Sequence, residues 1–254
     1  MKTQSHLLVL TAFLSLSATS CGKGVNTFDS PEHVLNTLKS GSTEAMTRTK
    51  QELHMPPMFI KNCENGDATL RDLELRPAVL EDGMKNAIIT AKCGYSFLVI
   101  TLVQEKSGKW RYQDSMPLSA VYDTLTVTLQ PIVNPPVQEV VVHGHVPAHG
   151  TGIYQADFVI LKVIDGHIRA VLDEIEQSHL DPPNGTAQPA VMQESTFNVR
   201  PKTSGDSASV IETQTLTVSG KSTVSEREFD WDDNLHIFEV GFWETSKPTS
   251  ANHK

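Results

Sequence analysis

From Met58 onward, the apolar residues of this sequence recur at every second position, which is the spacing of a half-buried β-strand. Two β-branched-rich runs of strand length lie at 87–91 and 97–103, and 121–129 alternates apolar residues with threonine. Short turns containing glycine or paired aspartates separate further runs as far as a hairpin that ends at Val240. We therefore expect a mainly β protein, either an antiparallel β-sandwich or two packed β units.

A short stretch ahead of these strands carries helix signals. Ser30 can cap a helix, Pro31 suits its first turn, and Glu32 complements its dipole. A second, mostly polar helix is expected over 43–53, and Pro56-Pro57 should end any helix there. The expectation is a short helical N-terminal element in front of the β body.

The sequence also predicts where the β body divides. Three prolines within 131–136 interrupt the strands, because proline cannot donate a hydrogen bond to a central ladder. We place the boundary there, between a first β unit at 58–130 and a second at 137–244. Residues 21–57 then form a tether and the N-terminal helices. Residues 245–254 show no apolar periodicity and are expected to be a disordered tail.

Residues 1–20 have the features of an export signal peptide. Lys2 gives a positive start, and the apolar run at 7–14 is shorter than the roughly 20 residues that span a bilayer. Ala18-x-Ser20 suits an ordinary signal peptidase, whereas small residues directly before Cys21 also suit cleavage coupled to lipid attachment. The two kinds of processing stay open at this point.

The second pattern resembles the lipobox of bacterial lipoproteins, in which the cysteine is lipidated and becomes the first residue of the mature chain. The resemblance covers only the leader and Cys21, and Ala18 stands where the lipobox usually has leucine. It implies attachment to a membrane through an N-terminal lipid. Gly22, in place of aspartate, resembles an outer-membrane address. The expected location is therefore the cell envelope, anchored in the outer membrane, with the periplasm or secretion as alternatives.

The chain has three cysteines, namely Cys21, Cys63 and Cys93. If Cys21 carries a lipid, the other two form an even pair in an oxidising compartment, which predicts a disulfide. In the chain-entropy description, closing a loop of this length stabilises the fold by about 3–4 kcal/mol. The alternative is two buried, unpaired thiols.

Acidic residues outnumber basic ones, giving a formal net charge of −9 at pH 7. Binding along a nucleic-acid backbone needs a basic surface, so we expect no nucleic-acid partner. The sequence lacks a Walker loop, a Gly-x-Gly-x-x-Gly turn and a Gly-x-Ser-x-Gly elbow. We therefore favour a non-enzymatic binding or structural protein without a cofactor, whose ligand is an unidentified protein or carbohydrate.

One compact group of side chains could carry chemistry, and it consists of His143, His145 and His149. In an extended strand His143 and His145 point to the same face, about 6.6 Å apart along the backbone, and can converge on one Zn²⁺. His149 could add a third nitrogen and leave a position for water, whose pKa would fall towards about 7. A zinc-binding protein or zinc-dependent hydrolase is thus the alternative function. The opposite interpretation is a surface turn with solvated imidazoles.

Three weaker patterns are also present. Aromatic residues could line a sugar-binding face, although aromatics on strands usually belong to the core. An acidic turn could hold Ca²⁺, although a plain hairpin tip is commoner. A group of acids could supply an acid/base pair, although acids between strands are normally solvated. The residues concerned are, respectively, Trp110, Tyr112, Trp231 and Trp243; Asp230, Asp232, Asp233 and Asn234; and Asp173, Glu174, Glu176 and Asp181.

Overall fold

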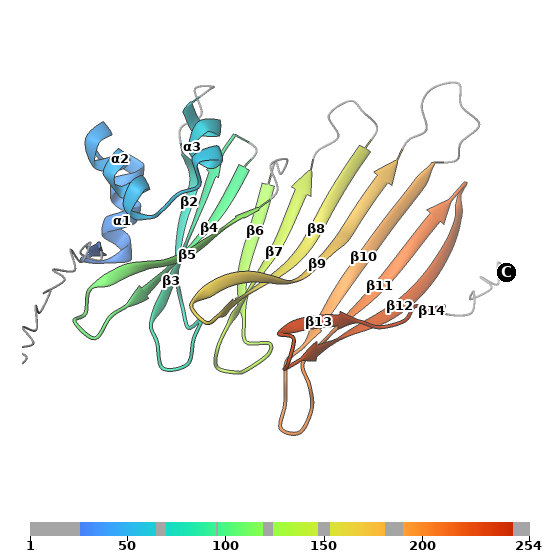
Figure 1. Cartoon of the computed structure of the whole chain (residues 1–254). Coiled ribbons are helices and arrows are strands. Elements are labelled where there is room, and N and C mark those ends of the chain that lie inside the picture. Colours follow the sequence, from blue (N-terminus) through green and yellow to red (C-terminus); the bar gives the residue numbers. More distant parts are fainter. Residues whose placement is uncertain are drawn as a thin grey trace, which may run out of the picture.

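The fold is mostly β, with 59% strand and 14% helix, and consists of two antiparallel sheets that pack together (Figure 1). The computed structural model describes residues 26–64, 70–94, 96–118, 124–146, 153–180 and 190–245. The few short helices lie near the N-terminus. The expected fold class, a mainly β protein with a helical N-terminal element, is therefore confirmed.

The first part of the chain forms three helices and a five-stranded sheet. Ser30 Oγ accepts a hydrogen bond from His33 N at the first helix start, and Ser42 Oγ accepts one from Ala45 N at the second. The sheet order is β1-β5-β4-β3-β2. The elements are β1 (Thr27–Phe28), α1 (Pro31–Ser40), α2 (Thr43–Glu52), α3 (Pro57–Glu64), β2 (Arg71–Ala78), β3 (Asn86–Cys93), β4 (Ser96–Gln104) and β5 (Trp110–Leu118).

Helix α3 differs from the expectation that Pro56-Pro57 ends the helical region. Pro57 is instead its first residue, a position where the missing N–H leaves no hydrogen bond unmade. Phe59 of this helix is buried with Val34 of α1 against the first sheet. The helices therefore cover one face of that sheet.

The second sheet has nine strands in the order β13-β12-β11-β10-β9-β8-β7-β6, with β14 pairing beside β12. Nearly all neighbours are joined by consecutive hairpins, so the sheet is a long antiparallel meander. Its strands are β6 (Thr124–Gln130), β7 (Glu139–Val146), β8 (Ile153–Ile164), β9 (His167–Leu180), β10 (Val191–Arg200), β11 (Ser209–Val218), β12 (Lys221–Asp232), β13 (Ile237–Val240) and β14 (Glu244–Thr245).

The proline-rich segment does not mark the change of sheet. β6 pairs with β7, so 131–136 is a connection inside the second sheet, and the first sheet's last strand in the chain, β5, ends at Leu118, before β6 begins at Thr124. The carboxylate of Glu139 explains the connection, because its Oε2 accepts hydrogen bonds from Ile132 N at 2.8 Å and Val133 N at 3.3 Å. The prolines stand in this loop, outside the ladder, where they remove no hydrogen bond of the sheet.

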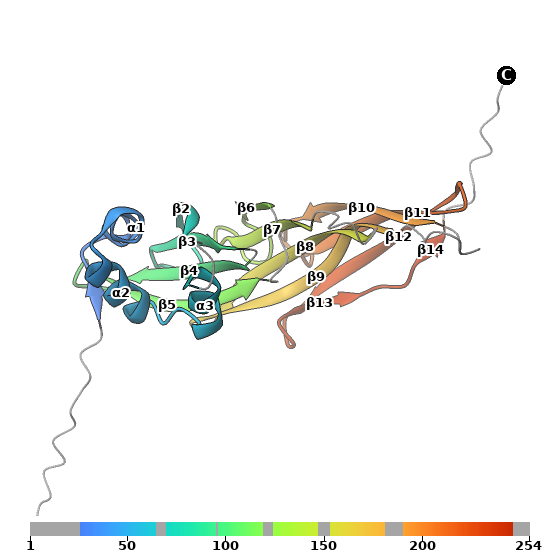
Figure 2. The same ribbon diagram turned by 90° about the horizontal axis from the view of Figure 1, so that it is seen from above.

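The two sheets pack face to face, with strands β2 to β5 of the first sheet against strands β6 to β9 of the second. Ile88 and Val99 of the first sheet are fully buried against Val142 and Leu161 of the second. Seen from above, β2 to β5 lie alongside β6 to β9 (Figure 2). β3 and β4 are apolar on both faces because helices cover one face and the second sheet covers the other.

A further core lies on the other face of the second sheet. β9 and β10 pair only between 177–180 and 191–194, so the rest of the two strands diverges. This divergence lets Phe229 and Trp231 of β12 pack with Phe158 and Ile160 of β8. Beyond this core, β10 to β12 extend away from the helices and form the opposite end of an elongated molecule (Figure 1).

Candidate functional site

Strand β7 places His143 and His145 on one face, as the sequence predicts for an extended strand. The Nδ1 of His143 lies 3.0 Å from Oε2 and 3.1 Å from Oε1 of Glu176. The His143 ring also meets the ring of Phe158 edge-on, with centroids 5.2 Å apart. The first of the three predicted histidines is therefore held between Glu176 and Phe158. It lies on the face of the second sheet that points away from the first sheet.

A β-bulge explains how Glu176 reaches His143. Ala156 pairs with Gln177 and Asp157 pairs with Ile175, so Glu176 is the extra residue of β9. Bulges redirect a side chain locally, and they recur next to functional sites. No spacing in the sequence marks this bulge, so the sequence did not show that Glu176 is the partner of His143.

The pairing has an electrostatic consequence. The hydrogen bond that His143 Nδ1 donates to the Glu176 carboxylate raises the pKa of His143 above its ordinary value of 6.5, although partial burial opposes this shift. A carboxylate on Nδ1 also fixes the proton there when the ring is neutral and leaves Nε2 as the ligating nitrogen. This is the arrangement that supports many metal-bound histidines.

The third predicted ligand, His149, lies outside the described residues, and so does Cys21. Among the residues that the structure describes, no group of three or more His, Cys, Asp or Glu side chains is placed to hold a metal ion. The three-histidine site therefore stays a prediction. In the predicted acidic turn, Asp232 Oδ1 accepts hydrogen bonds from Asn234 N and Leu235 N, and Asp233 Oδ1 accepts one from Trp231 Nε1, so these carboxylates hold the hairpin turn.

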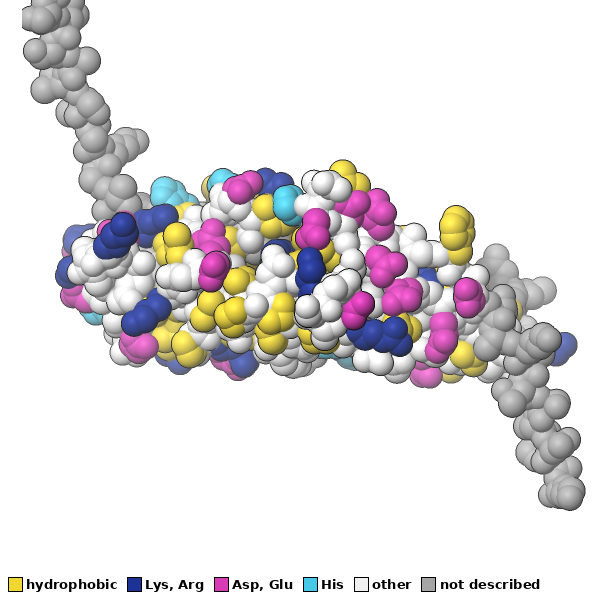
Figure 3. Space-filling model, turned by 90° about the horizontal axis from the view of Figure 1, so that it is seen from below, with side chains coloured by type: hydrophobic (Ala, Val, Ile, Leu, Met, Phe, Trp, Pro, Cys, Tyr) yellow, Lys and Arg dark blue, Asp and Glu magenta, His cyan; other side chains and the backbone are white. Residues whose placement is uncertain are grey.

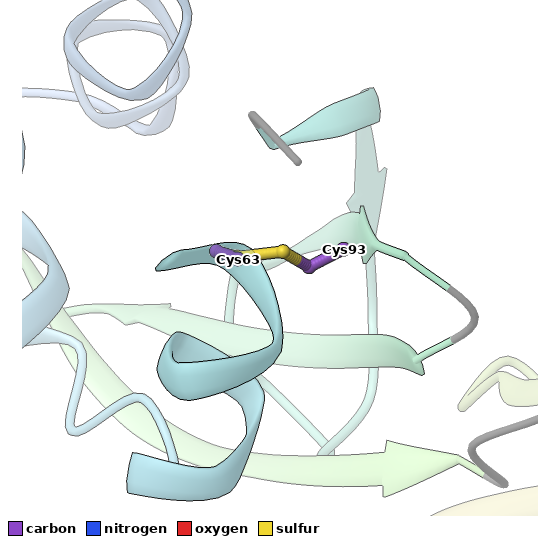
Figure 4. The surroundings of a disulfide bond; sticks show 2 residues. All are labelled: Cys63 and Cys93. Carbon is purple, nitrogen blue, oxygen red and sulfur yellow. A yellow bond between two sulfur atoms is a disulfide. The ribbon is translucent and has the colours of Figure 1, made fainter. Parts of the chain in front are cut away.

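The predicted disulfide is present. Cys63 at the end of α3 is joined to Cys93 at the end of β3, with Cα atoms 5.2 Å apart (Figure 4). Both side chains are buried in the core beneath the helices. The bond therefore fixes α3 to the first sheet.

A buried polar network crosses the second sheet on the same face as His143. Arg227 Nε donates to Glu212 Oε2 at 2.6 Å, and Ser195 Oγ donates to Glu212 Oε1 at 2.6 Å. Another Arg227 nitrogen donates to Glu174 Oε2 at 2.6 Å. The network joins β9, β10, β11 and β12, including the part where β9 and β10 no longer pair.

Aromatic rings complete the surroundings of Arg227. Its guanidinium carbon lies 4.6 Å from the ring centroid of Phe229 and 4.4 Å from that of Trp243. Trp243, which is 41% exposed, covers the arginine from the segment after β13. Burial raises the pKa of Glu174, and Arg227 opposes that rise.

The remaining sequence candidates are separated by the fold. Glu174 and Glu176 are engaged by Arg227 and His143, whereas Asp173 lies in an open cleft beside Asp157, between the end of β5 and strands β8 and β9. Burial, with the Asp157 charge, raises the pKa of Asp173. Asp181 lies outside the described residues. Of the three described members of the predicted group of acids, two are therefore engaged by cations on one face of the sheet, and Asp173 lies apart from them in the cleft.

The aromatic residues do not share a binding face either. Trp231 is buried in the second sheet's core, and Trp110 and Tyr112 pack against the core beneath the helices. Trp243 alone of the four is exposed, and it covers Arg227. On the side seen in Figure 3, acidic and basic side chains are interspersed along the length of the molecule.

Comparison with known proteins adds no relative. A scan against protein-family models, a search of curated proteins and a search of solved structures each found no match. None of the helices in the described ranges combines the length and apolar character needed to cross a bilayer. The class that the structure defines is thus a two-sheet antiparallel β protein with a disulfide-tied helical end.

Proposed function

We propose that this protein is an exported, lipid-anchored protein of the bacterial cell envelope, held in the outer membrane, with a binding or structural role rather than a catalytic one. The observation that carries the proposal is the disulfide between Cys63 and Cys93. Structural disulfides persist in oxidising compartments outside the cytosol. The bond also engages every cysteine except Cys21, which is the residue that the leader places at the lipid-attachment position.

The shape of the molecule supports an anchored role. Cys21 precedes β1 by a few residues, and β1 lies at the helical end. A lipid on Cys21 would therefore hold the helical end near the membrane and let the second sheet extend away from it. At the far end Leu180 of β9 and Leu216 and Val218 of β11, the two strands that flank β10, are exposed on one face of the sheet, which supports contact with a protein partner there.

Lipid attachment is tested by expressing the full chain in bacteria that are fed a labelled fatty acid. We expect label and membrane association for the wild type and neither for Cys21→Ser. The matched control is Cys63→Ser/Cys93→Ser, which also removes cysteines and should keep the label. An intact mass showing an unmodified Cys21 on the processed chain would refute the proposal.

One observation favours a second candidate, a zinc-binding protein or zinc-dependent hydrolase. The carboxylate of Glu176 lies on Nδ1 of His143, and His145 follows on the same face. If zinc binds here, His143, His145 and His149 would hold it, and the metal would supply a Lewis acid and an activated water.

Elemental analysis of untagged protein purified without added metal tests this candidate. Stoichiometric zinc that is lost in His143→Ala/His145→Ala, and weakened in Glu176→Gln, would support it. His167→Ala is the control, because His167 also contacts a carboxylate, that of Asp114, but lies at the first residue of β9, next to β5 rather than next to β7. A folded protein free of metal would reject the candidate.

A further inference from the structure

The edges of the two sheets differ in how well they are protected against added strands. The edge strands are β1 and β2 in the first sheet and β6 and β13 in the second, with β14 beside β12. Proteins protect edges by short strands, charged residues, proline or bulges, because an open edge presents unpaired backbone groups. β1 and β14 have two residues each and β13 has four. β2 carries several charges, Pro77 and a register shift between Arg71 and Glu74.

β6 is the exception among the described edge strands. It has seven residues, Thr-Leu-Thr-Val-Thr-Leu-Gln, with no charge and no proline, and its pairing with β7 is regular from end to end. Thr124, Thr126 and Thr128 are exposed on one face. This edge therefore has none of the four protective features.

The other face of β6 is incompletely covered. Val127 is buried between the sheets, but Leu125 and Leu129 are only half buried. A cleft opens between β6 and the first sheet here; Leu125 and Val127 of β6 and Phe97 of β4 line it, together with Asp72 and Glu74 of β2. On the opposite side of the sandwich, a hydrogen bond joins the two sheets: Asp114 Oδ2 of β5 accepts it from Ile168 N of β9 at 3.0 Å. An added strand at β6 would extend the apolar layer at its open side.

The sequence of β6 identifies the occupant. We infer that β6 pairs with β6 of a second copy of this chain, antiparallel about a two-fold axis at Val127. The strand reads almost the same in both directions from that residue, so Leu125 meets Leu129, and Thr126 meets Thr128. Cross-strand apolar pairs and threonine pairs stabilise a sheet.

This register also respects the two faces of the strand. Every pair joins residues of the same parity, so leucines stay on the sandwich side and threonines on the solvent side. A slip of one residue would set leucine against threonine. The two-fold contact is isologous and uses β6 on both copies, so assembly closes at a dimer with one continuous sheet.

The assembly is measured by light scattering and sedimentation of the full chain purified in mild detergent. We expect the wild type to be a dimer. Thr126→Lys/Thr128→Lys places like charges directly opposite each other across the axis and should weaken the dimer about tenfold or more. The matched control is Thr196→Lys/Asn198→Lys, two exposed positions with the same spacing on the central strand β10, which should stay dimeric.

Cysteine cross-linking tests the register. Thr126→Cys and Thr128→Cys chains should form an oxidised dimer when mixed. Each variant alone should cross-link no more than the wild type does. In that case the two new cysteines are diagonal neighbours across the axis, about 7–8 Å apart, which is too far for a disulfide. A chain that stays monomeric at every concentration would overturn the inference. A lysine variant that is as dimeric as the wild type would also overturn it. So would a single cysteine variant that cross-links as strongly as the mixture. These results are the ones expected if another protein, rather than a second copy, occupies the edge.

Discussion

Arg227 and Glu212 stand directly opposite each other on strands β12 and β11, and Arg227 Nε donates to Glu212 Oε2 at 2.6 Å. The Glu212 side chain is completely excluded from solvent. A carboxylate in that position is tolerated because the guanidinium and Ser195 Oγ satisfy both of its oxygens. The pair therefore depends on both partners being present.

Arg227→Met should lower the free energy of unfolding by about 3–5 kcal/mol, because it leaves the Glu212 charge buried without a positively charged partner. Glu212→Leu/Arg227→Met should recover much of that loss, because the buried Glu212 charge is then absent and only the partly exposed Glu174 loses its arginine. Urea unfolding followed by circular dichroism measures both variants. Arg48→Met is the control, since Arg48 pairs with Glu44 on the exposed surface and should change stability by less than about 1 kcal/mol. An equal loss in the single and double variants would contradict the explanation.

Loss of the disulfide should destabilise the helical end. Cys63→Ala/Cys93→Ala should lower the free energy of unfolding by about 2–4 kcal/mol, because the unfolded chain gains the freedom of the opened loop. Chemical reduction of the wild type should cause a similar loss, and reduction of the double variant should cause none. A double variant as stable as the oxidised wild type would show that the bond adds nothing.

The contact between His143 and Glu176 should make stability depend on pH. The folded pKa of His143 is raised above 6.5, so its contribution is fully present below the unfolded pKa and is lost as the pH rises through the folded value. The wild type should therefore exceed His143→Gln in stability at about pH 5–6, and the difference should shrink towards about pH 8–9. Because the pair is partly exposed, we expect a difference below about 1 kcal/mol.

Nuclear magnetic resonance titration of the His143 ring checks the cause. Glu176→Gln should lower the pKa of His143, because the amide no longer stabilises the charged ring. Glu226→Gln, on the exposed side of β12, should leave it unchanged. If the His143 ring has the same titration midpoint in both variants, Glu176 is not the cause of its raised pKa.

Packing between the sheets should depend on Leu161, which is fully buried against the first sheet. Leu161→Ala should cost about 2–5 kcal/mol, since it removes apolar contacts and leaves a cavity. Leu216→Ala makes the same chemical change at a position that is 36% exposed and should cost much less. Thermal unfolding of both variants in one buffer makes the comparison. Equal losses would mean that the sheets do not share a core at Leu161.

Local patterns in the sequence predicted what local forces decide. The alternation of apolar residues predicted the strands, Ser30 and Pro31 predicted the start of α1, and the even pair of cysteines predicted the disulfide. Local patterns misplaced features that depend on context. Pro57 begins a helix because the chain turns there to pack Phe59 on the sheet. β6 joins the second sheet because Glu139 closes its loop to β7.

By itself, the sequence determined the β character of the body, its helical beginning and the cysteines that pair, because each follows from spacing along the chain. Only the tertiary structure decided which charges meet: Glu176 reaches His143 across 33 positions, and Glu174 reaches Arg227 across 53. The physical reason is that such contacts depend on strand register, a bulge and the divergence of β9 from β10. None of these leaves a periodic trace in the order of residues.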